Sequence, residues 1–176
     1  MEKKIIYAFL ATLAMILVMQ WHGNFLKTSE APHGIYSVHN SDSIGELNEM
    51  INAVGAAKLR THIYLDFLFI IAYSTLLYLI AKSLSQFITK RPYLLISLIF
   101  IEVSLAIGAI DILENIVSLI NFSSLGTNFS IKLVRWAFIA RLILIGLMLL
   151  YIFIVSVWKI FSSVKEGKKI EIDDWL

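Results

Sequence analysis

The sequence predicts an all-α fold, a four-helix transmembrane bundle with an amphipathic helix in its first loop. Three observations support this prediction. Hydrophobic residues make up 59% of the 176 residues and charged residues only 16%, whereas a soluble domain is about 45–50% apolar and about 25% charged. The apolar residues gather into four runs that are long enough to cross a bilayer. The one long polar segment between the runs carries apolar residues at helical spacing.

The four runs define a single integral membrane domain over residues 1–176. The first run follows a short basic end, as in a signal peptide, but no small-x-small cleavage site comes after it. We therefore expect it to remain as the first span. An outer loop over residues 22–61 and a charged cytoplasmic tail over residues 159–176 flank the spans, which are predicted at about residues 5–21, 62–81, 93–120 and 131–158.

The loop over residues 22–61 is predicted to hold the amphipathic helix. Ser43 and Glu46 stand at the spacing of a capping box, in which a hydroxyl caps the helix and a carboxylate bonds back to the chain. Apolar residues then recur at helical spacing, at Ile44, Leu47, Met50, Ile51 and Val54. We expect this helix to lie in the membrane interface or to cover the mouth of the bundle.

Lysine and arginine predict the orientation of the spans, because cytoplasmic loops carry an excess of these residues. If the spans alternate, one side receives Lys3, Lys4, Lys82, Lys90, Arg91, Lys159, Lys165, Lys168 and Lys169. We therefore expect both termini in the cytoplasm and the loop over residues 22–61 outside. The cysteine-free, Ile- and Lys-rich composition looks bacterial, so the expected location is the bacterial cytoplasmic (inner) membrane.

The composition argues against several function classes. A net charge of +2 gives no polybasic character, so nucleic acid is not expected as a partner. The absence of cysteine removes disulfides, Fe–S clusters and cysteine-ligated zinc. No histidine lies in the core of a predicted span, where a b-type haem would need it. His22 and His62 are only weak candidates for a metal site, because the histidines match no metal-ligand spacing. No metal or other cofactor is predicted.

The third predicted span carries polar residues that hydrocarbon disfavours. Asp111, Glu114 and Asn115 stand at i, i+3 and i+4, so their side chains leave one side of a helix. A charge at the bilayer centre costs about 2.5–3.5 kcal/mol on insertion scales, and such residues usually face a protein interior or a wet cavity. This cluster is therefore the first candidate for a functional site, with Asp111 and Glu114 as candidate catalytic groups.

Neighbouring spans place further polar residues at the same depth. Asp66 and Tyr73 lie along one stripe of the second predicted span, and Arg135 and Arg141 lie in the outer part of the fourth. Opposite charges at one depth favour ion pairs of the two arginines with Asp66 and Asp111. The predicted ligand-binding residues are Asp66, Tyr73, Asp111, Glu114, Asn115, Arg135 and Arg141.

Two charged residues stay outside this set. Lys132 is expected at the head-group edge, where its long side chain can reach water. Glu102 is on the opposite side of the third predicted span from Asp111, nearer the cytoplasm, and the sequence assigns it no partner.

A resemblance to a known family rests on Pro32-His-Gly-Ile35, Leu65-Asp66-Phe67-x-Phe69-x-x-Ala72-Tyr73, Asp111-x-x-Glu114-Asn115 and a base early in the fourth predicted span. From about Ala31 onward, the chain resembles an uncharacterised family of small bacterial four-span membrane proteins. The Asp-x-x-Glu-Asn element is the most specific part of the likeness. The resemblance implies an architecture and a set of residues to test, and it implies no activity.

These observations favour a multi-pass inner-membrane protein with a polar, charged cavity at outer-leaflet depth. The cavity would bind a lipid-like or amphiphilic small molecule, with a base holding a phosphate or carboxylate head group and the acids holding hydroxyls or relaying protons. Three classes stay open: an intramembrane enzyme that uses carboxylate acid/base chemistry, a transporter, and an accessory or structural subunit whose buried ion pairs fix helix packing. A transport pathway through a single chain is disfavoured, because the inner half of the bundle is mostly apolar apart from Glu102. The partners under consideration are membrane lipids, a lipid-like ligand and a second copy of the chain.

Overall fold

A computed structural model of the chain describes residues 2–88 and 91–165. Every regular element in these residues is helical, which confirms the predicted all-α fold. The elements are, in chain order, α1 (Glu2–Asn24), α2 (Ile35–His39), α3 (Ile44–Val54), α4 (Ala56–Ser85), α5 (Arg91–Ile120), η1 (Asn121–Leu125, a π-helical turn) and α6 (Asn128–Lys165).

Four of these helices are long and apolar enough to cross a membrane, as predicted: α1, α4, α5 and α6. Two of them extend well beyond the predicted spans. Helix α4 begins at Ala56 rather than near His62, and α6 continues to Lys165, through the first part of the predicted tail. The rest of that tail, residues 166–176, lies outside the described residues. The stretch over residues 121–130, between the third and fourth predicted spans, is largely helical, because η1 prolongs α5 and α6 begins at Asn128.

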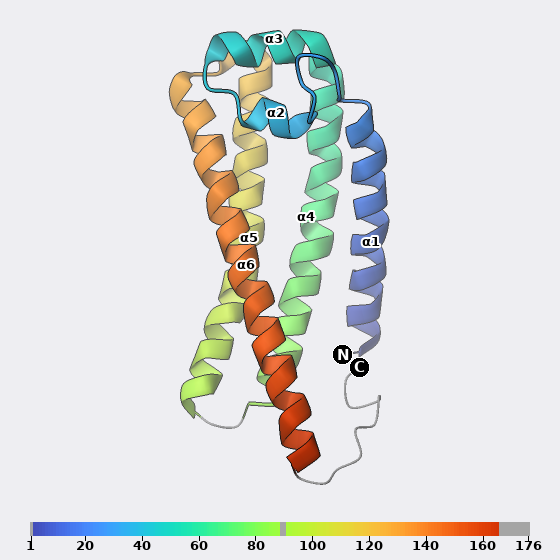
Figure 1. Ribbon diagram of the computed structural model, residues 1–176, viewed down its shortest axis with the longest axis vertical. Helices are drawn as coiled ribbons and strands as arrows, with labels where there is room; N and C mark the ends of the chain where they lie inside the picture. The colour runs from blue at the N-terminus through green and yellow to red at the C-terminus, as the bar shows by residue number, and fades with distance from the viewer. Residues whose placement is uncertain (1, 89–90, 166–176) are drawn as a thin grey trace.

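The four long helices run side by side along the long axis of the molecule, and α3 lies across one end with α2 beneath it (Figure 1). We call this end the capped end. Helix α1 packs on α4, α4 on α5, and α5 on α6, whereas α4 and α6 meet much less. Helix α1 is therefore the peripheral member of the bundle.

Helix α3, which lies across the capped end, begins at the capping box that the sequence predicts. The Ser43 hydroxyl accepts a hydrogen bond from the Glu46 backbone N–H at 3.2 Å, and the Glu46 carboxylate accepts one from the Asp42 N–H at 2.8 Å. The reciprocal bond of the capping box thus falls one residue before the N-cap. Helix α3 ends at Val54 and is capped by Gly55, whose φ of 96° lies in the left-handed region that favours glycine. This one residue separates α3 from α4.

Helices α4 and α5 approach each other closely at small residues. A Cβ added at Gly108 would lie 2.5 Å from the Ser74 hydroxyl oxygen and 3.2 Å from its Cβ. Gly108 follows Ser104 by four residues, a small-xxx-small spacing that is typical of close helix packing, and Ser104 is fully buried. The missing side chain at Gly108 therefore sets how near α4 can come to α5.

The apolar interior is divided into two clusters. The cluster at the capped end joins α3 to α4, η1 and α6, through Leu47, Met50, Val54, Leu59, Ile63, Phe122 and Ile131. The second cluster fills the rest of the bundle, around Ile70, Ile107, Met148, Tyr151 and Val155. Along each of α4, α5 and α6 a few polar residues stand between the two clusters. These residues form the candidate site.

Candidate functional site

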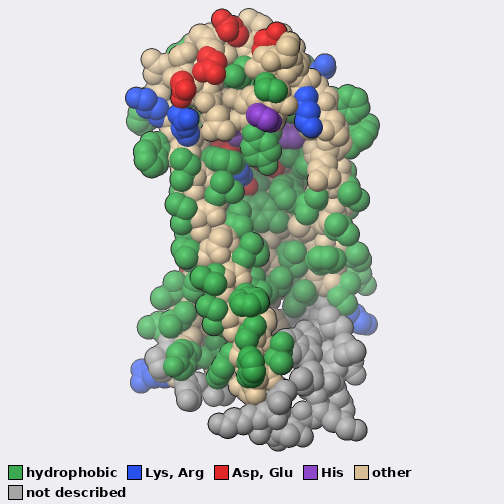
Figure 2. Space-filling view, viewed as in Figure 1, with side chains coloured by type: hydrophobic (Ala, Val, Ile, Leu, Met, Phe, Trp, Pro, Cys, Tyr) green, Lys and Arg blue, Asp and Glu red, His purple; other side chains and the backbone are tan. Residues whose placement is uncertain are grey.

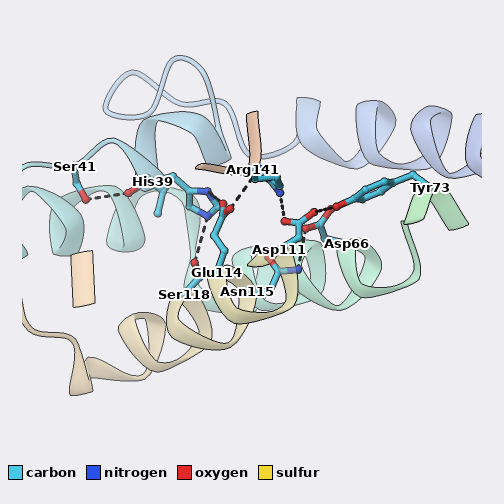
Figure 3. Close-up of polar contacts among 10 residues, drawn as sticks. His39, Ser41, Asp66, Tyr73, Asp111, Glu114, Asn115, Ser118 and Arg141 are labelled. Carbon is cyan, nitrogen blue, oxygen red and sulfur yellow. Dashed lines mark hydrogen bonds and ion pairs between the residues drawn. The ribbon is translucent and has the colours of Figure 1, made fainter. Parts of the chain in front are cut away.

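A layer of ionisable side chains crosses the bundle between the two apolar clusters, below the cap (Figure 3). Helix α4 provides Asp66 and Tyr73, α5 provides Asp111, Glu114, Asn115 and Ser118, α6 provides Arg141, and α2 provides His39. We call these residues the polar layer. Asp111 and Glu114 are each only 1% exposed, so the layer is an internal feature of the fold.

Arg141 connects α6 to two carboxylates of α5. Its Nη1 pairs with Oδ1 of Asp111, and its Nη2 lies 3.5 Å from Oε2 of Glu114. The second oxygen of Asp111 accepts a hydrogen bond of 2.6 Å from the Tyr73 hydroxyl. Both oxygens of Asp111 are therefore engaged, as the burial of a carboxylate requires.

Asp66 is hydrogen-bonded to a neutral amide, whereas Asp111 is paired with a guanidinium. Its Oδ2 accepts a hydrogen bond of 2.9 Å from the Asn115 amide. Asn115 follows Glu114 directly in the sequence, so the same turn of α5 serves both acids. The i, i+3, i+4 spacing of Asp111, Glu114 and Asn115 thus places all three side chains in the polar layer, as the sequence predicted.

His39 and Ser118 are the members of the polar layer that the sequence did not predict. Nδ1 of His39 lies 3.1 Å from Oε1 of Glu114, and its Nε2 lies 3.5 Å from the Ser118 hydroxyl. His39 ends α2, a helix of five residues in the long loop. Hydropathy and periodicity assign that loop to the outside of the bundle. No pattern in the loop indicates that one residue folds back onto a span.

Arg135 lies away from the polar layer. Its Nη1 pairs with Asp42 at 2.7 Å, and the two side chains are 45% and 75% exposed. The predicted pairing of Arg135 with a carboxylate of the spans is therefore wrong. The physical reason is helix geometry: Arg135 and Arg141 are six residues apart, which turns their side chains about 120° away from each other.

The two weak metal candidates meet each other at the capped end. Nδ1 of His22 on α1 lies 3.2 Å from Nδ1 of His62 on α4, and the rings stack with centroids 5.3 Å apart. One ring donates its N–H to the other, and the contact ties the end of α1 to α4. Within residues 2–88 and 91–165, no group of three or more His, Asp or Glu side chains is arranged to hold a metal ion.

The polar layer carries more acid than base. Three carboxylates, from Asp66, Asp111 and Glu114, face the single guanidinium of Arg141. Oε2 of Glu114 is buried and has no hydrogen-bond partner among the described residues. Chemically, such a layer can hold a proton, receive a hydrogen-bond donor or bind a cation.

The side of the molecule is hollowed next to the polar layer. Figure 2 shows a recess below the cap, between α6 and α1, in which atoms of acidic and basic side chains are visible beneath a histidine. The side chains of Arg141 and His39 are 16% and 10% exposed, whereas those of Asp111 and Glu114 are 1% exposed. The layer is therefore reached from the flank of the bundle, between two helices that could border lipid.

Two cavities differ in their relation to the polar layer. A cavity of about 10 Å³ lies beside His39 and Ser118, and it has room for about one water molecule. A larger space of about 520 Å³ lies between α5 and α6 toward the opposite end. The larger space is lined by apolar and aromatic side chains such as Tyr93, Phe100 and Trp158. The residues that line this space do not belong to the polar layer, so the space is separate from the candidate site.

Comparison of the chain with protein-family models, with curated proteins and with solved structures finds no match.

Proposed function

We propose that this chain is a multi-pass protein of the bacterial inner membrane that binds the polar head of an amphiphilic molecule at the polar layer. The observation that carries the proposal is the recess of Figure 2, which brings charged atoms to the flank of an otherwise apolar bundle. Ionisable groups within a span are costly, and they generally mark a functional site. A head group would enter the recess while its hydrocarbon tail stays among the lipids.

The arrangement of α1 supports entry from the side. Helix α1 packs on α4, and α6 packs on α5. Within the described residues, the side of α6 that faces α1 therefore has no closely packed helix against it. A molecule that moves within one leaflet would reach the polar layer between α1 and α6 without crossing the apolar half of the bundle. The side chain of Arg141 is 16% exposed and those of Asp111 and Glu114 are 1% exposed, so part of the layer is accessible to such a molecule.

The proposed depth is the outer leaflet, with both termini in the cytoplasm. The chain has no cysteine, so single-cysteine variants report orientation cleanly. Asn48→Cys on α3 and Gln86→Cys at the end of α4 are both exposed positions at opposite ends. In intact cells an impermeant maleimide should label Asn48→Cys and spare Gln86→Cys. Labelling of Gln86→Cys alone would mean that the orientation is the opposite of the one proposed.

Native mass spectrometry of the purified protein tests the binding proposal. We expect a specific amphiphile to co-purify with the wild type and to be lost from Asp111→Asn/Glu114→Gln at equal folded yield. The matched control is Asp42→Asn/Arg135→Gln, which removes an exposed pair outside the polar layer. If the wild type shows no enrichment of any molecule over bulk lipid, and the polar-layer variant unfolds, the ion pairs are structural and the binding proposal fails.

A further inference from the structure

We infer that the head group bound at the polar layer is cationic, and that it takes the place of the His39 imidazole on Glu114. This inference rests on the proposed function and names the chemical class of the ligand. It departs from the sequence-based expectation of a phosphate or carboxylate head. Three features of the polar layer lead to it: the balance of charge, the partners of Glu114 and the place of His39 in the fold.

The first feature is the balance of charge. With Asp66, Asp111 and Glu114 ionised and Arg141 protonated, these four side chains carry a net charge of −2. Arg141 is already paired with two carboxylates, so it has no charge left for an anionic head. An anion would add negative charge to a buried acidic layer, whereas an ammonium group would reduce the net negative charge of the layer.

The second feature is the incomplete set of partners around Glu114. This side chain is 1% exposed, yet its Oε2 has no hydrogen-bond partner among the described residues and lies 3.5 Å from the Arg141 guanidinium. Its Oε1 relies on His39 at 3.1 Å. A primary ammonium carries three N–H donors, which is enough to bond both oxygens of Glu114 and the Ser118 hydroxyl.

The third feature is the place of His39. The other polar-layer residues stand on α4, α5 and α6, whereas His39 stands on the five-residue α2. Helix α2 touches α6 through an edge contact of the Tyr36 and Phe138 rings, with centroids 6.1 Å apart. Val38, the residue before His39, is buried in the apolar cluster at the capped end. His39 can therefore leave Glu114 by rotation of its own side chain, without unpacking the long helices.

The small cavity beside His39 shows why the imidazole must move. It measures about 10 Å³, room for about one water and too little for an alkylammonium head. The imidazole thus occupies the position that the ligand needs, and it acts as a plug on the polar layer. Removing the imidazole should make the cationic ligand bind more tightly, because the ligand no longer competes with it.

Two matched probes test the inference: a single-chain primary alkylammonium and the alkyl phosphate of the same chain length. Binding to the purified full-length protein is measured in nanodiscs of zwitterionic lipid, by native mass spectrometry over a concentration series. We expect the alkylammonium to bind at least about tenfold more tightly than the alkyl phosphate, which corresponds to about 1.4 kcal/mol. Glu114→Gln should remove this preference.

Variants of two histidines in the same loop distinguish displacement of the His39 imidazole from a general loosening of the loop. His39→Ala should tighten alkylammonium binding by about tenfold. His33→Ala is the matched control, because His33 is exposed in the same loop, and it should leave binding unchanged. Thermal unfolding of each variant in the absence of probe shows whether it is folded. If Glu114→Gln does not fold, Glu114→Asp, which keeps the charge and shortens the side chain, takes its place and should weaken alkylammonium binding.

The outcomes distinguish this inference from the proposed function. If the alkyl phosphate binds as tightly as the alkylammonium, or more tightly, the cationic class is wrong while an amphiphile site remains. If His39→Ala weakens alkylammonium binding, His39 is part of the binding site and the displacement is wrong. If neither probe binds better than bulk lipid to wild type or to His39→Ala, the proposed function itself fails.

Discussion

The guanidinium of Arg141 on α6 pairs with the carboxylate of Asp111 on α5, inside the bundle and between two apolar clusters. Two helices are thereby held at one register by opposite charges away from bulk water. In such a place the loss of one partner leaves an uncompensated charge, so the energetics of the pair depend strongly on which residue is removed.

A double-mutant cycle should reveal this asymmetry. Arg141→Gln alone leaves the acids of the polar layer without their guanidinium, and we expect a loss of about 3–5 kcal/mol in the free energy of unfolding. Asp111→Asn/Arg141→Gln should lose less than the sum of the two single variants. Reversible unfolding in mixed detergent micelles measures each value. Additive losses would mean that the two side chains do not interact.

The exposed pair of Arg135 and Asp42 provides the control for that cycle. Its two members lie in solvent-accessible positions, where an ion pair contributes about 0–1 kcal/mol. Arg135→Gln and Asp42→Asn should therefore change the free energy of unfolding little, singly or together. A coupling energy as large as that of Arg141 and Asp111 would contradict the distinction between the two pairs.

The hydroxyl of Tyr73 should matter more than that of Tyr151. Both tyrosines are buried, but Tyr73 donates to the Asp111 carboxylate at 2.6 Å and Tyr151 donates to the Ser97 hydroxyl at 2.8 Å. A hydrogen bond to a charged group contributes about 1.5–3 kcal/mol and a neutral one about 0.5–1.5 kcal/mol. Tyr73→Phe should therefore destabilise the protein more than Tyr151→Phe, measured by the same unfolding assay. Equal losses would argue that Asp111 is uncharged.

The close approach of α4 and α5 predicts a steric effect at Gly108. Gly108→Ala places a Cβ 2.5 Å from the Ser74 hydroxyl oxygen, and overpacking of this kind costs about 1–3 kcal/mol. Ser74→Ala should restore part of the loss, because the clashing oxygen is removed. Gly146→Ala is the matched control, since a Cβ there meets nothing within 4 Å. Destabilisation by Gly146→Ala of the same size would mean that the effect is not steric.

The N-cap of α3 predicts a smaller effect on the free energy of unfolding. Ser43→Ala removes the acceptor for the Glu46 backbone N–H, and the loss of an N-cap costs about 1 kcal/mol. Ser29→Ala, in the same loop, removes a hydroxyl that bonds only the exposed Glu30 carboxylate among the described residues, and it should cost less than about 0.5 kcal/mol. Thermal unfolding compares the two. A loss at Ser29 as large as that at Ser43 would argue against a capping role.

The sequence by itself determined the number of long apolar helices, the N-cap of α3 at Ser43 and the shared face of Asp111, Glu114 and Asn115. These features depend on residues close together in the chain: the length of an apolar run, a capping box of four residues and the 3.6-residue repeat of a helix. They need no knowledge of which helices become neighbours.

Only the tertiary structure decided the partners of the charged groups. Hydropathy gives the depth of Arg135 and Arg141 but not the rotation of α6, and that rotation sends Arg141 to Asp111 and Arg135 to Asp42. The placement of His39 on Glu114 depends on how a loop folds back over the capped end. Both are contacts between residues far apart in the chain, set by how whole helices and loops pack, and no local pattern of residue types encodes that packing.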